Sequence, residues 1–188
     1  MSKNRILILL FFSVLIIGII SLFFGRFYIG PITVIKIVIS KILPIKQTWP
    51  ETMETVILQV RLPRVFLAML VGASLSISGA AFQGLFQNPL VSPDILGVSS
   101  AAGFGAAIAI LLSGNLITVQ ITALCFGLVG VFVTYLLSRV HKMTPTLMLV
   151  LSGVVISAFF SALISLVKYI ADPYEKLPVI TFWLMGSL

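Results

Sequence analysis

Few residues of this chain are of a type that does chemistry. It contains one histidine, His141, one cysteine, Cys125, and five acidic residues scattered along 188 positions. These residues have neither the spacing of a metal-binding cluster nor the pairing of a nucleophile with a base at membrane depth. No glycine-rich phosphate loop is present either. The sequence therefore predicts a protein that is not an enzyme and has no cofactor or metal site of its own.

Two arginines, Arg61 and Arg64, stand on either side of a Leu-Pro pair and precede a charge-free run from Val65 to Pro93. On a helix that begins at about Leu62, positions three apart share a face, so both guanidinium groups can project from one rim. Guanidinium forks suit the recognition of carboxylates. Arginines at a helix end also anchor it at the membrane surface by snorkelling. The residues alone leave both interpretations open.

Asp94 lies near the end of the same run, where an acid close to a membrane is costly and often functional. It follows Ser92 and Pro93, and this order is typical of a helix start in which the acid faces the positive end of the helix dipole. We therefore predict that Asp94 belongs to a helix cap and not to a proton relay.

The composition indicates a protein dissolved in lipid. Apolar residues make up 60% of the chain and charged residues 9%, against about 25% charged in an ordinary soluble domain. A soluble protein of this size cannot hide so much apolar surface. The net charge of +7 comes from cations scattered singly between apolar segments, which favours membrane flanks or a protein partner over nucleic acid.

Charge-free lengths predict an all-α, polytopic transmembrane bundle with about five spans, since each crossing takes about 20 residues. The spans are expected at 6–25, 62–86, 94–112, 116–138 and 146–170. Flanking prolines predict an interfacial helix at 32–43, and a short membrane-edge helix is expected at 174–188. A turn at 113–115 and a basic loop with Arg139, His141 and Lys142 separate the later spans.

Small residues that recur every four positions mark faces on which helices pack in lipid. Two such ladders lie in the second and third expected spans: Gly72, Ser76 and Ala80, and Ala101, Gly105 and Ala109. The fifth expected span carries a stripe of small and hydroxyl residues: Gly153, Ser157, Ser161 and Ser165. Packing explains this stripe if the hydroxyls bond back to the preceding turn. An uncharged wall of a translocation pathway is the other interpretation, and both stay open.

A series of motifs occurs in consistent order over most of residues 56–188. They are Arg61-Leu-Pro-Arg64, Leu70-Val-Gly-Ala, Ser78-Gly-Ala, Gln83-Gly-Leu-Phe, Asn88-Pro-Leu, Leu96-Gly-Val-Ser, Leu151-Ser-Gly153 and Phe182-Trp-Leu-Met-Gly-Ser187. Together they resemble the FecCD/BtuC-type permeases, which are the membrane subunits of ABC importers for iron-siderophores, haem and vitamin B12.

The resemblance implies a type II importer, in which two copies or two related subunits of a ten-helix fold enclose a central pathway. Cytoplasmic ATPases bind the ATP, and a substrate-binding protein delivers an iron chelate or cobalamin-type molecule for passage inward across the cell membrane. The resemblance implies that Arg61 and Arg64 face outward and pair with acidic residues of that binding protein. It also places Ser157 and Ser161 on the pathway, and Gly153 and Ser165 less directly.

The chain stops where the sixth helix of this family begins, so we expect a partial permease domain, 1–188, without the segment that couples to the ATPase. The alternative is a truncated, non-transporting membrane scaffold or assembly partner. A channel or secondary transporter usually shows intramembrane charges or internal repeats, and neither is visible.

The family orientation places the N-terminus in the cytoplasm. Four cations then lie inside: Lys3, Arg5, Arg139 and Lys142. Eight lie outside: Arg26, Lys36, Lys41, Lys46, Arg61, Arg64, Lys168 and Lys176. The positive-inside rule favours the opposite orientation. We expect the family orientation nevertheless, because an outer collar that recruits an acidic partner needs external cations.

Overall fold

The computed structural model of the protein describes residues 3–44, 46–89, 91–139 and 146–186. Every regular element in these ranges is helical, which confirms the predicted all-α fold. The chain divides into two compact units, the first within residues 1–76 and the second within residues 77–187. The boundary between them falls inside one long helix.

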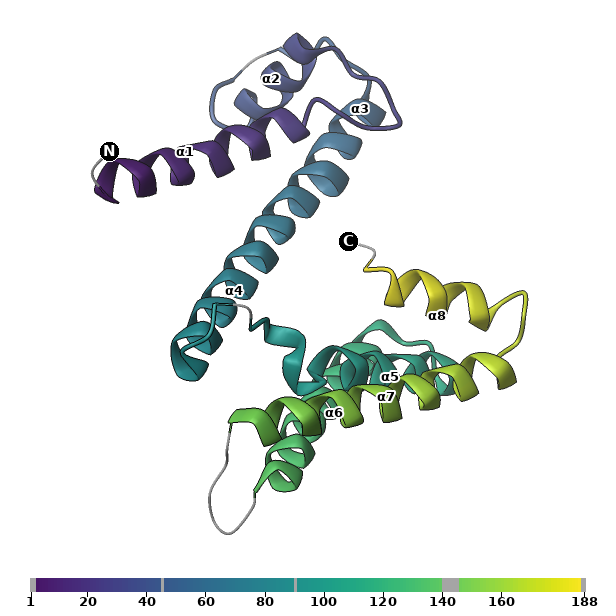
Figure 1. Cartoon of the computed structure of the whole chain (residues 1–188). Coiled ribbons are helices and arrows are strands. Elements are labelled where there is room, and N and C mark those ends of the chain that lie inside the picture. The colour runs from purple at the N-terminus through teal and green to yellow at the C-terminus, as the bar shows by residue number, and fades with distance from the viewer. Residues whose placement is uncertain (1–2, 45, 90, 140–145, 187–188) are drawn as a thin grey trace. The chain divides into compact units, whose positions relative to one another are not determined.

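The first unit contains α1 (Lys3–Ser21), α2 (Pro31–Ile39), α3 (Glu51–Thr55), the π-helix η1 (Val56–Arg61) and the first part of α4 (Leu62–Phe86). The last three follow one another without a break and form one helix (Figure 1). The α4 bounds match the expected span, but the helix does not begin there. Pro63 cannot donate to the carbonyl four residues earlier, and the wider π turn before it carries the helix past this point.

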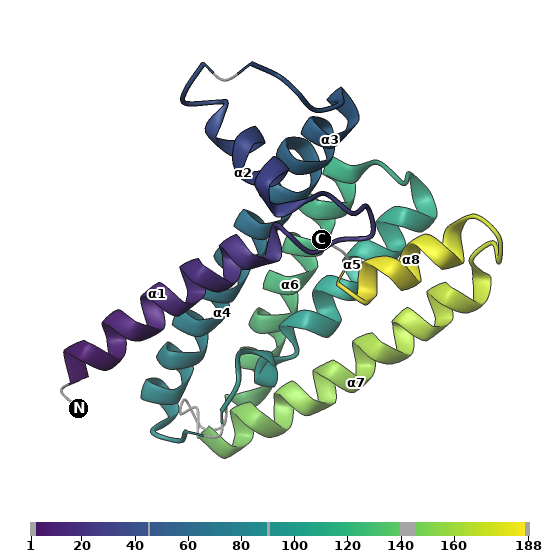
Figure 2. The same cartoon turned by 90° about the horizontal axis from the view of Figure 1, so that it is seen from above.

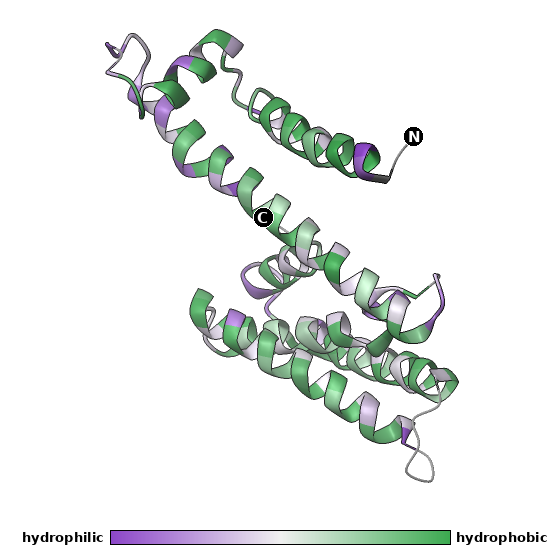
Figure 3. Ribbon diagram, turned by 90° about the vertical axis from the view of Figure 1, so that its left-hand side faces the viewer, coloured by the Kyte–Doolittle hydropathy of each residue, from purple (hydrophilic) through white to green (hydrophobic). Residues whose placement is uncertain are grey.

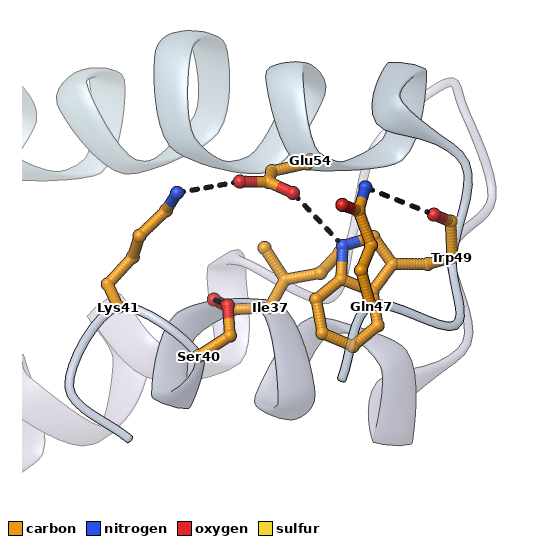
Figure 4. A network of polar contacts seen from close by, with 6 residues as sticks. All are labelled: Ile37, Ser40, Lys41, Gln47, Trp49 and Glu54. Atoms are coloured by element: carbon orange, nitrogen blue, oxygen red, sulfur yellow. Dashed lines mark hydrogen bonds and ion pairs between the residues drawn. The ribbon is translucent and has the colours of Figure 1, made fainter. Parts of the chain in front are cut away.

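Buried apolar side chains hold α2 against η1: Ile29, Val34, Ile37, Trp49 and Ile57. Polar contacts link the same segments beside this small core (Figure 4). Lys41 Nζ lies 2.7 Å from Glu54 Oε1, and Trp49 Nε1 donates to Glu54 Oε2 at 3.2 Å. Glu54 therefore connects the segment after α2 to the beginning of the long helix. The helix α2 itself ends at Ile39, before the expected boundary at residue 43.

The second unit consists of the 3-10 turn η2 (Pro93–Leu96), α5 (Val98–Leu112), α6 (Leu116–Ser138), α7 (Thr146–Ile170) and α8 (Lys176–Leu184). α5 packs against both α6 and α7, and α8 folds back onto α5 (Figures 1 and 2). Small buried residues on α5 allow this close approach, because they let helix backbones come near one another. The rings of Phe104, Phe126 and Phe160 meet between these helices, with centroids 5.2–6.5 Å apart.

The third expected span differs most from the structure. Gly97 adopts a left-handed backbone conformation with φ 74°, so the α-helix begins at Val98 and not at Asp94. The 15 residues of α5 extend for about 22 Å, less than the hydrocarbon thickness of about 30 Å. Its far end is as predicted, with Gly114 at φ 66° and the Asn115 side chain accepting from the N–H of Ile117.

The other four expected spans fall on helices long and apolar enough to cross a membrane: Asn4–Ser21, Glu51–Phe86, Leu116–Ser138 and Thr146–Ile170. Apolar residues predominate along these helices (Figure 3), and many of them are exposed. Leu7 and Ile17 on α1, for example, are both 65% exposed. Such faces need lipid or another apolar partner as their surroundings. His141, Lys142 and Pro145, which were expected in the basic loop and at the next helix start, lie outside the described residues.

One hydrogen bond between elements provides a test of this packing. Thr134 is completely buried, and its hydroxyl donates to the carbonyl of Leu96 in η2 at 2.9 Å. We expect Thr134→Val to lower the free energy of unfolding by about 1 kcal/mol, because the carbonyl loses its donor at nearly constant side-chain volume. Unfolding in mild detergent, followed by circular dichroism, measures the change.

Thr122→Val is the matched control, since the Thr122 hydroxyl bonds back to Thr118 in its own helix. We expect it to change stability by less than about 0.5 kcal/mol. Equal losses in the two variants would show that the Thr134 contact does not hold η2.

Candidate functional site

The two arginines predicted to form a common rim have different surroundings. Arg61 is only 8% exposed. Its Nη1 donates to the carbonyl of Leu22 at 2.8 Å, and its Nη2 donates to the carbonyl of Phe27. Both acceptors lie in the turn that follows α1. Arg61 therefore holds this turn against the long helix.

Gly25 lies directly beneath the Arg61 guanidinium. A Cβ placed on this glycine would be 2.6 Å from Nη2 and 2.8 Å from Cζ of Arg61. A side chain at position 25 would displace the guanidinium from the place in which it reaches both carbonyls. The position of Gly25 just after α1 is thus explained by the arginine that packs on it.

Arg64 is exposed, one turn further along the same helix. The two guanidinium groups predicted to share one rim therefore differ in exposure: Arg64 is exposed, whereas Arg61 is buried. Sequence reasoning could not find the difference, because the acceptors of Arg61 lie 39 and 34 residues away along the chain.

A pocket of about 370 Å³ opens beside these residues, entirely within the first unit. Three arginines line it: Arg26, Arg61 and Arg64. The rest of the wall is mainly apolar, from Phe24, Phe27, Val56, Val60 and Val65. Arg26 was not among the predicted site residues. Its position immediately after the charge-free run of the first span is the signal that indicates it.

The stripe on α7 separates into two parts. Gly153 is buried, and a Cβ on it would lie 1.8 Å from the carbonyl oxygen of Ile95, so this residue packs directly on η2. Ser157 is half-buried beside Gly97. Ser161 and Ser165 are exposed, and the Ser165 hydroxyl donates to the Ser161 carbonyl at 3.0 Å.

The two predicted packing ladders also have different surroundings. Ala101 is fully buried, and a Cβ on Gly105 would lie 2.5 Å from the Thr122 carbonyl oxygen on α6. Gly72 and its ladder neighbours Ser76 and Ala80 are exposed. A Cβ on Gly72 would meet no atom within 4 Å in the described part of the chain. The sequence pattern is the same in the two ladders, and only the folded structure shows which ladder is buried and which is exposed.

The predicted helix cap at Ser92 needs correction. Pro93–Leu96 is a 3-10 turn, and the side chain of Ser92 makes no capping hydrogen bond to it. The Asp94 carboxylate instead accepts a hydrogen bond from the hydroxyl of Ser99, in the first turn of α5. Asp94 therefore fastens η2 to the helix that follows.

These features define a multi-pass helical membrane protein that carries an arginine-lined pocket at the end of its first apolar helix. A sequence model of the FecCD transport family matches residues 13–188. The chain belongs to this family of ABC importer permeases, as its motifs predicted. The family is one of transport proteins and not of enzymes.

Two relatives and one solved structure show how far the similarity extends. The chain is 42% identical to the molybdate import system permease protein MolB of Haemophilus influenzae, over 99% of this chain and 55% of MolB. It is 40% identical to the cobalamin import system permease protein BtuC of Halobacterium salinarum, over 77% of this chain and 39% of that protein. A structure described as an inward-facing conformation of a proposed metal-chelate type ABC transporter matches with a TM-score of 0.75 and 39% identity, over 99% of this chain and 53% of the other. The chain thus spans about half the length of these proteins or less.

Proposed function

We propose that this chain forms part of the membrane-spanning permease of a binding-protein-dependent ABC importer. Its substrate is a metal-containing small molecule that passes inward across the cell membrane. The observation that carries the proposal is the fold match over 99% of the chain, made at 39% sequence identity. An iron chelate such as a siderophore or haem, or a cobalamin-type molecule, is the proposed substrate class. The names of the relatives add molybdate to the substrates worth testing.

The proposed importer includes three kinds of partner besides the lipid bilayer. A second permease copy or a related subunit completes the pathway, and a cytoplasmic ATPase binds the ATP. A substrate-binding protein docks on the outer face. The proposed orientation has the N-terminus in the cytoplasm, which places Arg64 and the arginine-lined pocket on the outer side. Family membership supports these partners.

Within this importer, Arg64 is the proposed docking residue, because its guanidinium is exposed and free to meet a carboxylate of the binding protein. Arg61 supports docking indirectly, by fixing the turn after α1 beside Arg64. On α7, exposed Ser161 suits an uncharged pathway wall, with Ser157 at its edge. Ser165 is exposed on the same helix, and its hydroxyl bonds back to the Ser161 carbonyl. Gly153 contributes close packing and not a lining surface.

Charge reversal at Arg64 tests the docking role. We expect Arg64→Glu, in the assembled permease in lipid nanodiscs, to weaken binding of the substrate-binding protein about tenfold or more at low salt, because attraction to a carboxylate becomes repulsion. Arg139→Glu is the matched control: it reverses another exposed arginine, at the C-terminal end of α6, and should leave the affinity unchanged.

Equal affinities for the wild type and Arg64→Glu would contradict the docking role. Uptake into proteoliposomes of a radiolabelled iron chelate, cobalamin or molybdate tests transport itself. Docking without uptake of any of these would contradict the proposed import activity and favour the membrane scaffold.

A further inference from the structure

We propose that the arginine-lined pocket of the first unit binds the phosphate group of an anionic phospholipid. The site goes beyond the transport activity, since neither a substrate nor a partner protein is needed to fill it. Its lining combines three guanidinium groups, from Arg26, Arg61 and Arg64, with a largely apolar wall. This combination matches an amphiphile with an anionic head.

No acidic residue balances the positive charge of the pocket in the described part of the chain. Its lining contains no acidic residue, and Lys41–Glu54 is the one ion pair found among the described residues. Arg61 uses one donor on Leu22 and one on Phe27, which holds its guanidinium rigidly in the wall. Arg26 is exposed, so its donors are available to a bound anion, and Arg64, the proposed docking residue, adds its positive charge to the same wall. Phosphate oxygens accept such charge-assisted hydrogen bonds in bidentate fashion.

The level at which the pocket lies in the membrane favours a lipid over a free anion. Arg26 directly follows the charge-free run that begins at Ile6, and Val65, directly after Arg64, begins the other. Both runs are long enough to enter the hydrocarbon, so the pocket lies where they leave it, at the level of the phospholipid head groups. Phe24 and Val60 in the wall are apolar and exposed, and they suit the glycerol and upper acyl region of a lipid. This placement holds for either orientation of the chain in the membrane.

Native mass spectrometry of the chain in mild detergent, titrated with phosphatidylglycerol or phosphatidylcholine, tests the proposal. We expect wild-type protein to retain phosphatidylglycerol preferentially and Arg26→Gln to lose most of this preference, with affinity falling about fivefold or more, because one charge-assisted interaction is removed. Arg26→Lys keeps the charge without the fork and should be intermediate. Arg139→Gln removes one exposed cation outside the pocket and should behave as the wild type.

Three outcomes would overturn the proposal. Equal lipid retention by the wild type and Arg26→Gln, with unchanged helical content, would show that the pocket holds no lipid. Binding of inorganic phosphate that depends on Arg26, without such dependence for the lipid, would assign a free anion to the pocket. Loss of binding-protein affinity in Arg26→Gln with lipid retention intact would assign the pocket to protein docking. Failure of Arg64→Glu to weaken docking, by contrast, contradicts the docking role alone.

Discussion

Gly153→Ala is expected to lower the free energy of unfolding by about 3 kcal/mol, the upper end of the usual cost of overpacking. The new Cβ would lie 1.8 Å from the carbonyl oxygen of Ile95 and 3.1 Å from Cα of Leu96. Both are backbone atoms, so no side chain can rotate away to make room. The turn η2 must move off α7, and its contact with the helix is lost. Thermal unfolding of the chain in mild detergent measures the loss.

Gly72→Ala is the matched control for this substitution. It makes the same chemical change in another long apolar helix, at a position where the added Cβ meets no atom within 4 Å in the described part of the chain. Because alanine favours helix by about 1 kcal/mol over glycine, the control should be neutral or slightly stabilising. A Gly153 variant as stable as the Gly72 variant would contradict the close packing of α7 on η2.

Arg61→Ala is expected to lower the free energy of unfolding by about 2–4 kcal/mol, because two carbonyls lose hydrogen bonds from a charged donor. The effect should be local to the first unit. The amide protons of residues 22–30 should exchange faster with solvent, since the turn after α1 then loses the two hydrogen bonds that Arg61 donates to it. Hydrogen–deuterium exchange in detergent measures this change together with the overall stability.

Arg64→Ala provides the contrast, because the two arginines share one helix and one residue type. Arg64 is exposed, so its truncation should change stability by less than about 0.5 kcal/mol and leave exchange at residues 22–30 as in the wild type. Similar exchange profiles for the two variants would show that Arg61 does not organise this turn. Arg61→Lys should give an intermediate profile, because an ammonium group lacks the fork that reaches both carbonyls.

The sequence predicted α6 and α7 with the bounds that the structure shows, because strong local signals mark them. Asn115 caps α6, and uninterrupted apolar runs fill both helices. The start of α5 was predicted at the wrong residue because the local sequence signal there is ambiguous. Ser92, Pro93 and Asp94 are typical of any helical turn, and only the left-handed conformation of Gly97 shows that the turn ends before the α-helix begins.

The sequence singled out two arginines of the candidate site, Arg61 and Arg64, but neither Arg26 nor the geometry of the site. The series of motifs that begins at Arg61 correctly indicated the family, since residue types and spacing carry that information. The burial of Arg61 depends on carbonyls contributed by a distant turn, and no helical spacing encodes them. The pocket was missed for the same reason, because Arg26 and Arg61 come together only in the folded unit.

The π turn at Val56–Arg61 changes the direction in which the side chains before it point relative to those after it, within one helix of 36 residues. Removing one residue from it would restore the ordinary periodicity and rotate the preceding residues by about 100° relative to α4. Ile57, now buried against α2, would turn away from its neighbours, while Arg64 would keep its direction. The number of residues in this turn therefore sets the angular offset between the packed beginning of the helix and its membrane-spanning part.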